Sequence, residues 1–143
     1  MKRHESLAPL SREHHPSLLL AQLLKKNAPA YRGMPTEPVS KAAYAAEQFD
    51  SSIKQHFSKE EQMLEKLKGL NHAIDLLAAE IIQEHRALTD SFIAIRSSDD
   101  LVNDLHTLGN RLEQHIRKEE RVLFPLIEQH CPEKMLAEIM LLH

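Results

Sequence analysis

The stretch His115-Ile-Arg-Lys-Glu119-Glu120 repeats the pattern of an earlier stretch, His56-Phe-Ser-Lys-Glu60-Glu61. Both read His-x-x-x-Glu-Glu. Residues four positions apart lie above one another on the same face of an α-helix, so each stretch directs an imidazole and a carboxylate to one side. Two such pairs predict a helical protein whose core holds metal ions.

The composition favours helices in a single domain spanning residues 1–143. The chain has three glycines, no tryptophan and few aromatic residues, and its many Leu, Ala, Glu and Lys residues lose little rotamer freedom in a helix. The size suffices for a substantial core without disulfides. The fold class expected is therefore all-α.

Charge and cysteine usage exclude several classes of protein. A net charge of −3 and a pI near 6.4 provide no basic surface for nucleic acid or an anionic membrane. The single cysteine, Cys131, cannot form an internal disulfide. Since no apolar run has the length of a signal peptide or a membrane span, we expect a cytoplasmic protein that binds neither nucleic acid nor membrane.

Apolar periodicity with capping and breaking residues predicts four long helices and a short tail helix. The first begins with Ser11 as N-cap and ends near Asn27, and a connection with three prolines leads to the second, at about 39–67. Asn71 caps the third, which ends near Arg96, and the fourth follows Ser97–Asp100. The bundle covers about 10–128 and the tail helix about 133–142. Apolar spacing of three and four residues predicts antiparallel packing in up-down-up-down order.

Histidine and glutamate interrupt the apolar faces of these helices at regular positions. The fourth helix illustrates the pattern, because its predicted inward face is Leu101, Leu105, Leu108, Leu112, His115, Glu119, Val122 and Leu126. His56 and Glu60 lie on the apolar face of the second helix, and His85 on that of the third. On the first helix, His14 and His15 precede Pro16, which makes the helical phase ambiguous. Periodicity favours His14, and His15 remains an alternative.

This set of residues predicts a site for two divalent ions. A lone core histidine is more often a hydrogen-bonded structural residue, but two buried carboxylates without a partner would cost several kcal/mol each. No lysine or arginine shares their faces, so cations are the simplest compensation. Imidazole and bridging carboxylates fit iron or manganese better than tetrahedral zinc. Six side chains cannot saturate two six-coordinate ions, which leaves positions open for water, oxygen, nitric oxide or peroxide.

The order of these residues, with Phe124-Pro125 closing the last motif, resembles the hemerythrin-like HHE cation-binding family over roughly residues 10–128. The resemblance implies a four-helix bundle with two non-haem Fe ions joined by an oxo or hydroxo bridge, with Mn or Zn as substitutes. It implies bridging roles for Glu60 and Glu119. The implied metal ligands are His14 or His15, His56, Glu60, His85, His115 and Glu119. Glu61 and Glu120 are expected beside the ligands or in solvent.

Departures from the oxygen-carrying members shift the expected function. Those proteins have His-x-x-x-His on the third helix, whereas Ile81 and Thr89 flank His85 at that spacing. Four histidines and two glutamates are closer to the bacterial di-iron proteins that repair iron–sulfur clusters under nitrosative or oxidative stress, although those carry an additional cysteine-bearing N-terminal domain. Reversible oxygen carriage is not supported.

Three hypotheses follow for the function. The first is a di-iron protein that binds or senses oxygen, nitric oxide, peroxide or iron itself. The second is an enzyme on the same ligand set, such as a peroxide-consuming, ferrous-oxidising or cluster-repairing activity, and the absence of a separate acid, base or nucleophile leaves it undecided. The third is a metal-free interaction protein, whose tail helix forms a homodimer or contacts another partner.

Overall fold

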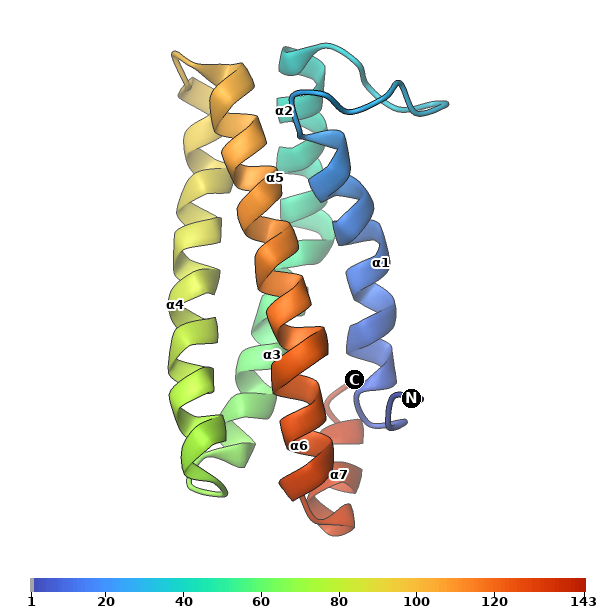
Figure 1. Cartoon of the computed structure of the whole chain (residues 1–143), viewed down its shortest axis with the longest axis vertical. Helices are drawn as coiled ribbons and strands as arrows, with labels where there is room; N and C mark the ends of the chain where they lie inside the picture. The colour runs from blue at the N-terminus through green and yellow to red at the C-terminus, as the bar shows by residue number, and fades with distance from the viewer. Residues whose placement is uncertain (1) are drawn as a thin grey trace.

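The computed structural model describes residues 2–143, which form helices and connections without strands. Four long helical rods run alternately up and down (Figure 1), which confirms the all-α bundle with a short C-terminal helix. The helices are α1 (Ala8–Leu23), α2 (Pro38–Gln48), α3 (Lys54–Leu67), α4 (His72–Ala94), α5 (Leu101–Lys118), α6 (Phe124–His130) and α7 (Glu133–Met140).

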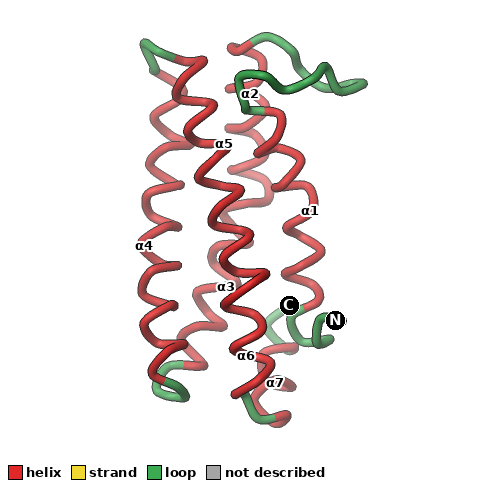
Figure 2. Tube along the Cα trace, viewed as in Figure 1, coloured by secondary structure: helices red, strands yellow, loops and turns green. Residues whose placement is uncertain are grey.

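Two of the rods are composite. A π-helical segment, Phe49–Ile53, joins α2 to α3, and a second, Glu119–Leu123, joins α5 to α6. Figure 2 shows that the helical trace continues through both junctions. A 3₁₀ turn, Ile95–Ser97, ends the α4 rod. The second predicted helix therefore exists as one rod, but its hydrogen-bond pattern changes in the middle.

The first helix begins four residues earlier than predicted, with Leu7 rather than Ser11 at the N-cap position. Pro9 lies in its first turn, where a fixed φ and a missing N–H are compatible with a helix start. The backbone N–H groups of Leu7 and Ala8 both donate to the His4 carbonyl at 3.0 Å. Ser11 is thus not the N-cap, because the chain is already helical there. The helix also ends at Leu23, before the predicted Asn27.

Other predicted helix ends are confirmed. Asn71 caps α4, since its Oδ1 accepts a hydrogen bond from Ile74 N at 3.1 Å. Gly69 has a φ of 87°, the left-handed conformation that glycine supplies after a helix C-terminus. The turn between α3 and α4 is therefore encoded locally.

The second π-helical segment corrects the predicted inward face of the fourth rod. Val122 is 45 % exposed and Leu126 is only partly buried, whereas Leu123 and Ile127 are fully buried. A π turn contains one more residue than an α turn, so every later side chain is displaced around the helix axis. The prediction failed after Glu119 because it carried the α-helical phase through this turn.

The core consists of two apolar clusters. One lies towards the α2 end and includes Phe49, Phe92 and Leu108, and the other lies towards the α7 end and includes Met63 and Phe124. The histidine and glutamate positions of the sequence motifs lie between the two clusters along each rod.

The tail helix α7 packs on the bundle. Leu136 and Ile139 are buried in the cluster at this end, where Figure 1 also shows both termini. Its apolar face is therefore used within the chain, and a contact with another protein stays a prediction. Among residues 2–143, no helix combines the length and apolarity that crossing a membrane would require.

Gly109 allows α1 and α5 to approach closely. A Cβ atom at this position would lie 2.6 Å from the Ala21 carbonyl oxygen and 3.2 Å from Leu24 Cβ. Backbone atoms of a packed helix cannot move away cheaply, so the glycine is required by the α1–α5 contact.

We expect Gly109→Ala to destabilise the protein by about 1–3 kcal/mol, the usual cost of overpacking, although alanine has the higher helix propensity. Chemical denaturation would measure this change. Thr107→Ala, on the exposed side of the same helix, should change stability by only a few tenths of a kcal/mol. Equal stability of the Gly109→Ala variant and the parent would show that the helices can separate at no cost.

Candidate metal centre

Six polar side chains form a buried layer between the two apolar clusters. Glu60 and Glu119 have no exposed surface, and the four histidines are at most 7 % exposed. The layer comprises His14, His56, Glu60, His85, His115 and Glu119. Every rod contributes to it, so the structure brings together six of the residues that the sequence analysis singled out.

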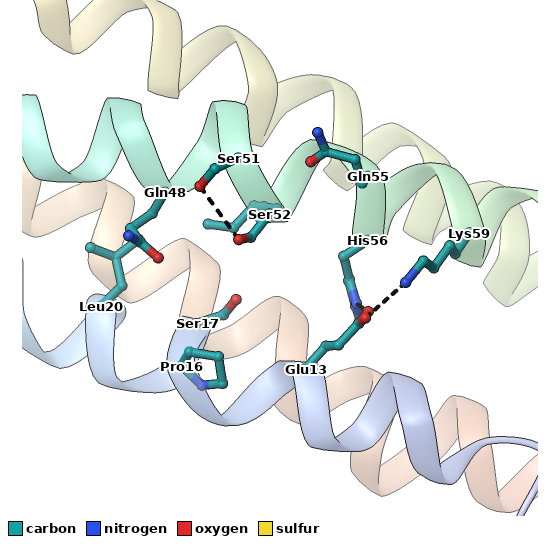
Figure 3. A pocket seen from close by; sticks show the side chains of 11 residues that line it. Glu13, Pro16, Ser17, Leu20, Gln48, Ser51, Ser52, Gln55, His56 and Lys59 are labelled. Atoms are coloured by element: carbon teal, nitrogen blue, oxygen red, sulfur yellow. Dashed lines mark hydrogen bonds and ion pairs between the residues drawn. The ribbon is translucent and has the colours of Figure 1, made fainter. Parts of the chain in front are cut away.

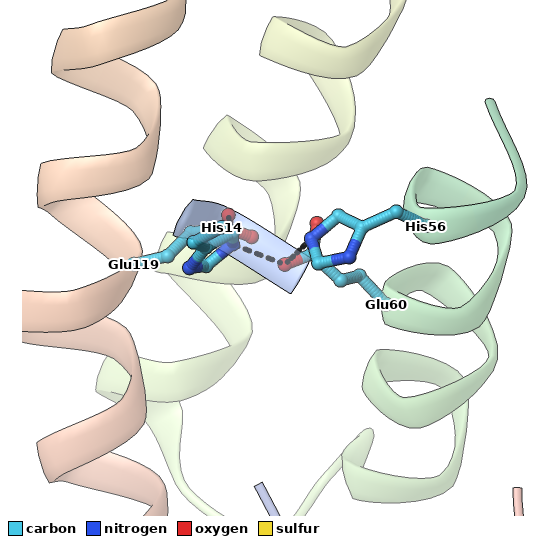
Figure 4. Close-up of side chains that lie close together, drawn as sticks. All are labelled: His14, His56, Glu60 and Glu119. Carbon is cyan, nitrogen blue, oxygen red and sulfur yellow. Dashed lines mark ion pairs between the residues drawn. The ribbon is translucent and has the colours of Figure 1, made fainter. Parts of the chain in front are cut away.

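The six side chains divide into two groups that share the carboxylates. The first group is His14, His56, Glu60 and Glu119, and the second is Glu60, His85, His115 and Glu119. One ligand atom of each residue lies within 4.8 Å of those of its group. Figure 4 shows the first group, with the two imidazoles and two carboxylates directed at one another. Two neighbouring ions with shared carboxylates match this division.

Glu60 is oriented to bridge the groups. Its Oε2 lies 3.0 Å from His56 Nε2 and 3.4 Å from His14 Nε2, while its Oε1 lies 3.0 Å from His85 Nε2. Two ligands about 2.1 Å from one ion and at right angles are separated by about 3 Å. The Glu60 separations are therefore compatible with atoms that share a metal ion, and without an ion they are those of ion pairs.

Glu119 faces both groups from the opposite rod. Its Oε1 lies 3.1 Å from His14 Nε2 and 3.3 Å from His115 Nε2. Glu119 is also the first residue of the second π-helical segment. Single π turns occur often at functional sites, and here the turn follows the last metal-facing side chain.

Unpaired polar atoms at the centre of the layer test whether metal ions fit. Six buried atoms of the layer form no hydrogen bond, although most of them lie within ion-pair distance of one another: His14 Nε2, His56 Nε2, His115 Nε2, Glu60 Oε2, Glu119 Oε1 and Glu119 Oε2. Buried polar atoms without partners cost free energy, so such a concentration requires compensation. Imidazole nitrogens and carboxylate oxygens are metal donors, and all six atoms face the shared centre. The residues present fit a pair of cations.

Each histidine is held from outside by a carboxylate of the neighbouring rod. The Nδ1 atoms donate hydrogen bonds of 2.6–2.8 Å, which leaves every Nε2 directed at the centre. The pairs are Glu13 with His56, Glu61 with His85, Glu84 with His115, and Glu120 with His14. Each pair joins one rod to the next, so the four pairs form a closed ring around the bundle, here called the outer carboxylate ring.

Cations outside the ring neutralise three of these carboxylates. Lys59 donates to Glu13 at 2.8 Å, Lys118 donates to Glu84, and Arg3 forms an ion pair with Glu120 at 3.2 Å. Ser11 also donates to Glu120, at 2.8 Å. The residue predicted to cap the first helix therefore supports the ring instead.

The ring resolves the roles left open by the sequence. His14 is buried and bound to Glu120, whereas His15 is on the exposed face of α1, so His15 is not part of the layer. The helical phase passes through Pro16 without a change, which places only His14 inward. Glu61 and Glu120 do not act as additional inner carboxylates. Each instead orients a histidine of another rod.

Sequence reasoning missed Glu13 and Glu84. A signal for both was present, because each directly precedes an inward histidine, in Glu13-His14 and Glu84-His85. Consecutive helical residues point in directions about 100° apart, so the carboxylate reaches the adjacent rod while the imidazole points inward. The same signal would have favoured His14 over His15, since only His14 follows a glutamate.

Without metal, protons supply the positive charge in the layer. Burial opposes charging of His14, but Glu119, Glu120 and Glu60 outweigh it and raise the pKa of His14 to about 11. Burial likewise opposes charging of His115, and Glu119 and Glu84 raise its pKa to about 10. The pKa of Glu60 is well below its usual value, because His56, His14 and His85 outweigh its burial. Metal ions would displace these protons.

The metal-free protein should therefore lose stability as the pH rises. The raised pKa values of His14 and His115 stabilise the folded state fully below the unfolded pKa near 6.5, and this contribution is lost towards pH 10–11. Each retained proton accounts for at most about 1.4 kcal/mol per pH unit. Thermal unfolding after chelation, measured from pH 6.5 to 9.5, should show a falling midpoint. A flat or rising midpoint would contradict the proton-filled layer.

The outer carboxylate ring should strengthen metal binding. Glu84→Gln keeps the shape but removes the charge that receives His115 Nδ1–H, and loss of such an outer partner typically lowers metal affinity 10–100-fold. Competition with a chelator would measure the affinity. Glu113→Gln is the matched control, because Glu113 pairs with Lys25, just after α1, and with Arg117 on α5, and no ion pair joins it to a histidine of the layer. Equal losses in the two variants would exclude a specific role for the ring.

The comparison with protein families agrees with this geometry. The model of the hemerythrin HHE cation binding domain matches residues 6–127, which include all six inner residues and the whole outer carboxylate ring. Comparisons of the chain with curated proteins and with solved structures gave no match. Because the family model covers most of the chain and the buried histidine–glutamate layer fits cations, this protein belongs to the hemerythrin HHE cation-binding family.

Proposed function

We propose that this protein binds two iron ions in the polar layer and uses their open coordination positions to react with or sense a small ligand such as oxygen, nitric oxide or peroxide. The observation that carries the proposal is the convergence of unpaired buried nitrogen and oxygen atoms on two groups that share Glu60 and Glu119.

The ligand set supports iron over zinc. Each group offers two imidazoles and two shared carboxylates, without a thiolate, since the single cysteine is buried elsewhere in the apolar cluster near α7. Tetrahedral structural zinc would be saturated by four side chains per ion, whereas shared carboxylates and open positions suit iron or manganese. A bound iron pair would supply redox chemistry and a place for an exogenous ligand.

The chain's own residues orient the site and isolate it from water. Four Nδ1–H donors to the outer carboxylates fix the imidazole planes before any ion arrives. Phe57 stacks on His85 with ring centroids 4.0 Å apart, and Phe124 stacks on His14 at 5.7 Å. These rings cover the two ends of the layer, so the bound ligand would sit in a mainly dry environment.

Metal analysis tests the proposal directly. Protein produced in iron-replete cells should contain about two iron ions per chain and show the charge-transfer absorption of a bridged ferric pair. The double variant His56→Ala, His115→Ala should lose most of this iron, because each group then lacks one imidazole. The matched double variant His15→Ala, His72→Ala removes two exposed histidines and should retain it.

Reactivity requires a separate measurement. Nitric oxide added to the reduced iron protein should change its visible spectrum within seconds. Peroxide added to the reduced or to the oxidised iron protein should do the same. Two bound zinc ions in place of iron would contradict the proposed function. So would an iron pair that reacts with none of oxygen, nitric oxide and peroxide.

A further inference from the structure

We propose that the small ligand reaches the metal pair through the groove between α1 and the first π-helical segment, where Ile53 forms the gate and the Ser17 hydroxyl donates a hydrogen bond to the bound ligand. This inference rests on the proposed function and concerns the ligand's path and its recognition.

A narrow void adjoins the metal-facing atoms on one side. It is lined by His14, His56, His115 and Glu119, and so touches ligands of both groups. Its remaining walls are Ile53, Phe57, Leu112 and Ile116, together with one hydroxyl-bearing residue, Ser17. An exogenous ligand at this place would meet apolar side chains on most sides and a single non-ligand donor.

A groove of about 270 Å³ lies outside this void (Figure 3). Ser17, Ile53 and His56 line both spaces, so they form the wall between solvent and the metal pair. The groove is otherwise lined mainly by polar side chains, among them Gln48, Ser51 and Gln55.

Each wall of the groove contains a departure from the full α-helical hydrogen-bond ladder. Pro16 lines it from α1 and lacks the N–H of a regular helical residue, and the facing wall is the π-helical Phe49–Ile53. A proline and a π turn each loosen the regular hydrogen-bond ladder. The π-helical segment contains Ile53 itself, and Pro16 lines the same groove.

Two further grooves on the described part of the chain reach a histidine of the layer. The groove between α3 and α4 meets His85, but Phe57 is stacked on that imidazole. The groove between α4 and α5 meets His115 beside the buried Leu88, and shares no other residue with the void. The α1 groove shares three lining residues with the void, whereas each of these two grooves shares one, which favours the α1 groove as the route.

The void is too narrow to hold a water molecule. A ligand can therefore enter it only if a side chain of its wall moves, and that side chain is the gate. Ile53 is 4 % exposed and touches both spaces, so rotation or truncation of this side chain connects them. Ser17 is only partly buried, and among the residues drawn in Figure 3 it has no hydrogen-bond partner. Ser17 borders the void, and its hydroxyl is the donor that we assign to the bound ligand.

Azide binding to the oxidised iron protein tests the gate. Stopped-flow absorption should show that Ile53→Ala raises the association and dissociation rates together by about tenfold, within the range seen among variants of one binding site. Ile53→Val should give a smaller increase and covers the case in which the alanine variant folds poorly. Leu88→Ala, which opens the α4–α5 groove to a similar extent, should change the rates less than about twofold.

The Ser17 role has its own readout. Ser17→Ala should weaken azide binding by about tenfold through faster dissociation, the effect of one lost hydrogen bond to a charged ligand. It should also shift the infrared stretching band of bound azide, and Ser17→Thr should restore both. Thr89→Ala, in the α3–α4 groove, should leave the band unchanged.

The outcomes separate the two proposals. A parent protein without two irons overturns the proposed function and the route with it. A parent with two irons that binds azide, but whose rates respond equally to Ile53→Ala and Leu88→Ala, overturns the gate alone. An unchanged azide band and affinity in Ser17→Ala overturns the recognition role.

Discussion

The burial of two carboxylates, Glu60 and Glu119, is the constraint on which the rest of this structure depends. Neither has exposed surface, and a buried carboxylate without compensation costs several kcal/mol. Groups of opposite charge alternate from the centre of the layer outwards. Imidazoles surround the carboxylates, further carboxylates hold the imidazoles, and Lys59, Lys118 and Arg3 lie outside three of those. The centre alone lacks enough partners, and this deficit defines the metal site.

The outer carboxylate ring couples the metal site to the bundle. Every rod provides one inward histidine and one carboxylate for the histidine of the next rod. The orientations of the four imidazoles therefore depend on the packing of all four rods. Arg3 extends this coupling to the N-terminal segment, because it pairs with Glu120 and also with Glu128 near the tail. Metal binding and correct packing of the rods therefore stabilise one another.

Irregular helix is concentrated around the polar layer. The segment 119–123 begins at a metal-facing glutamate, and the segment 49–53 ends three residues before His56. The first of these rotates the following apolar face so that Leu123 and Ile127 are buried, and the second borders the groove beside α1. The regular parts of the rods build the two apolar clusters, while the irregular turns adapt the rods to the site.

The sequence by itself determined the four helices, their antiparallel order and the inward placement of His56, Glu60, His85, His115 and Glu119. These features follow from spacing of three and four residues along single helices, which is local information. Helix ends were predictable where a local cap acts, as at Asn71, but not at Ser11, where residues 3–10 decide the start.

Only the tertiary structure decided the features that depend on neighbouring rods. It selected His14 over His15, because Pro16 left the phase ambiguous until Glu120 was seen to hold one imidazole. It placed a π-helical segment at Glu119–Leu123, and no periodicity in the sequence predicts this segment. It also showed that the second glutamate of each repeated motif supports a histidine of another rod. Contacts between residues about 24 to 106 positions apart control these choices, and helical spacing carries no information about them.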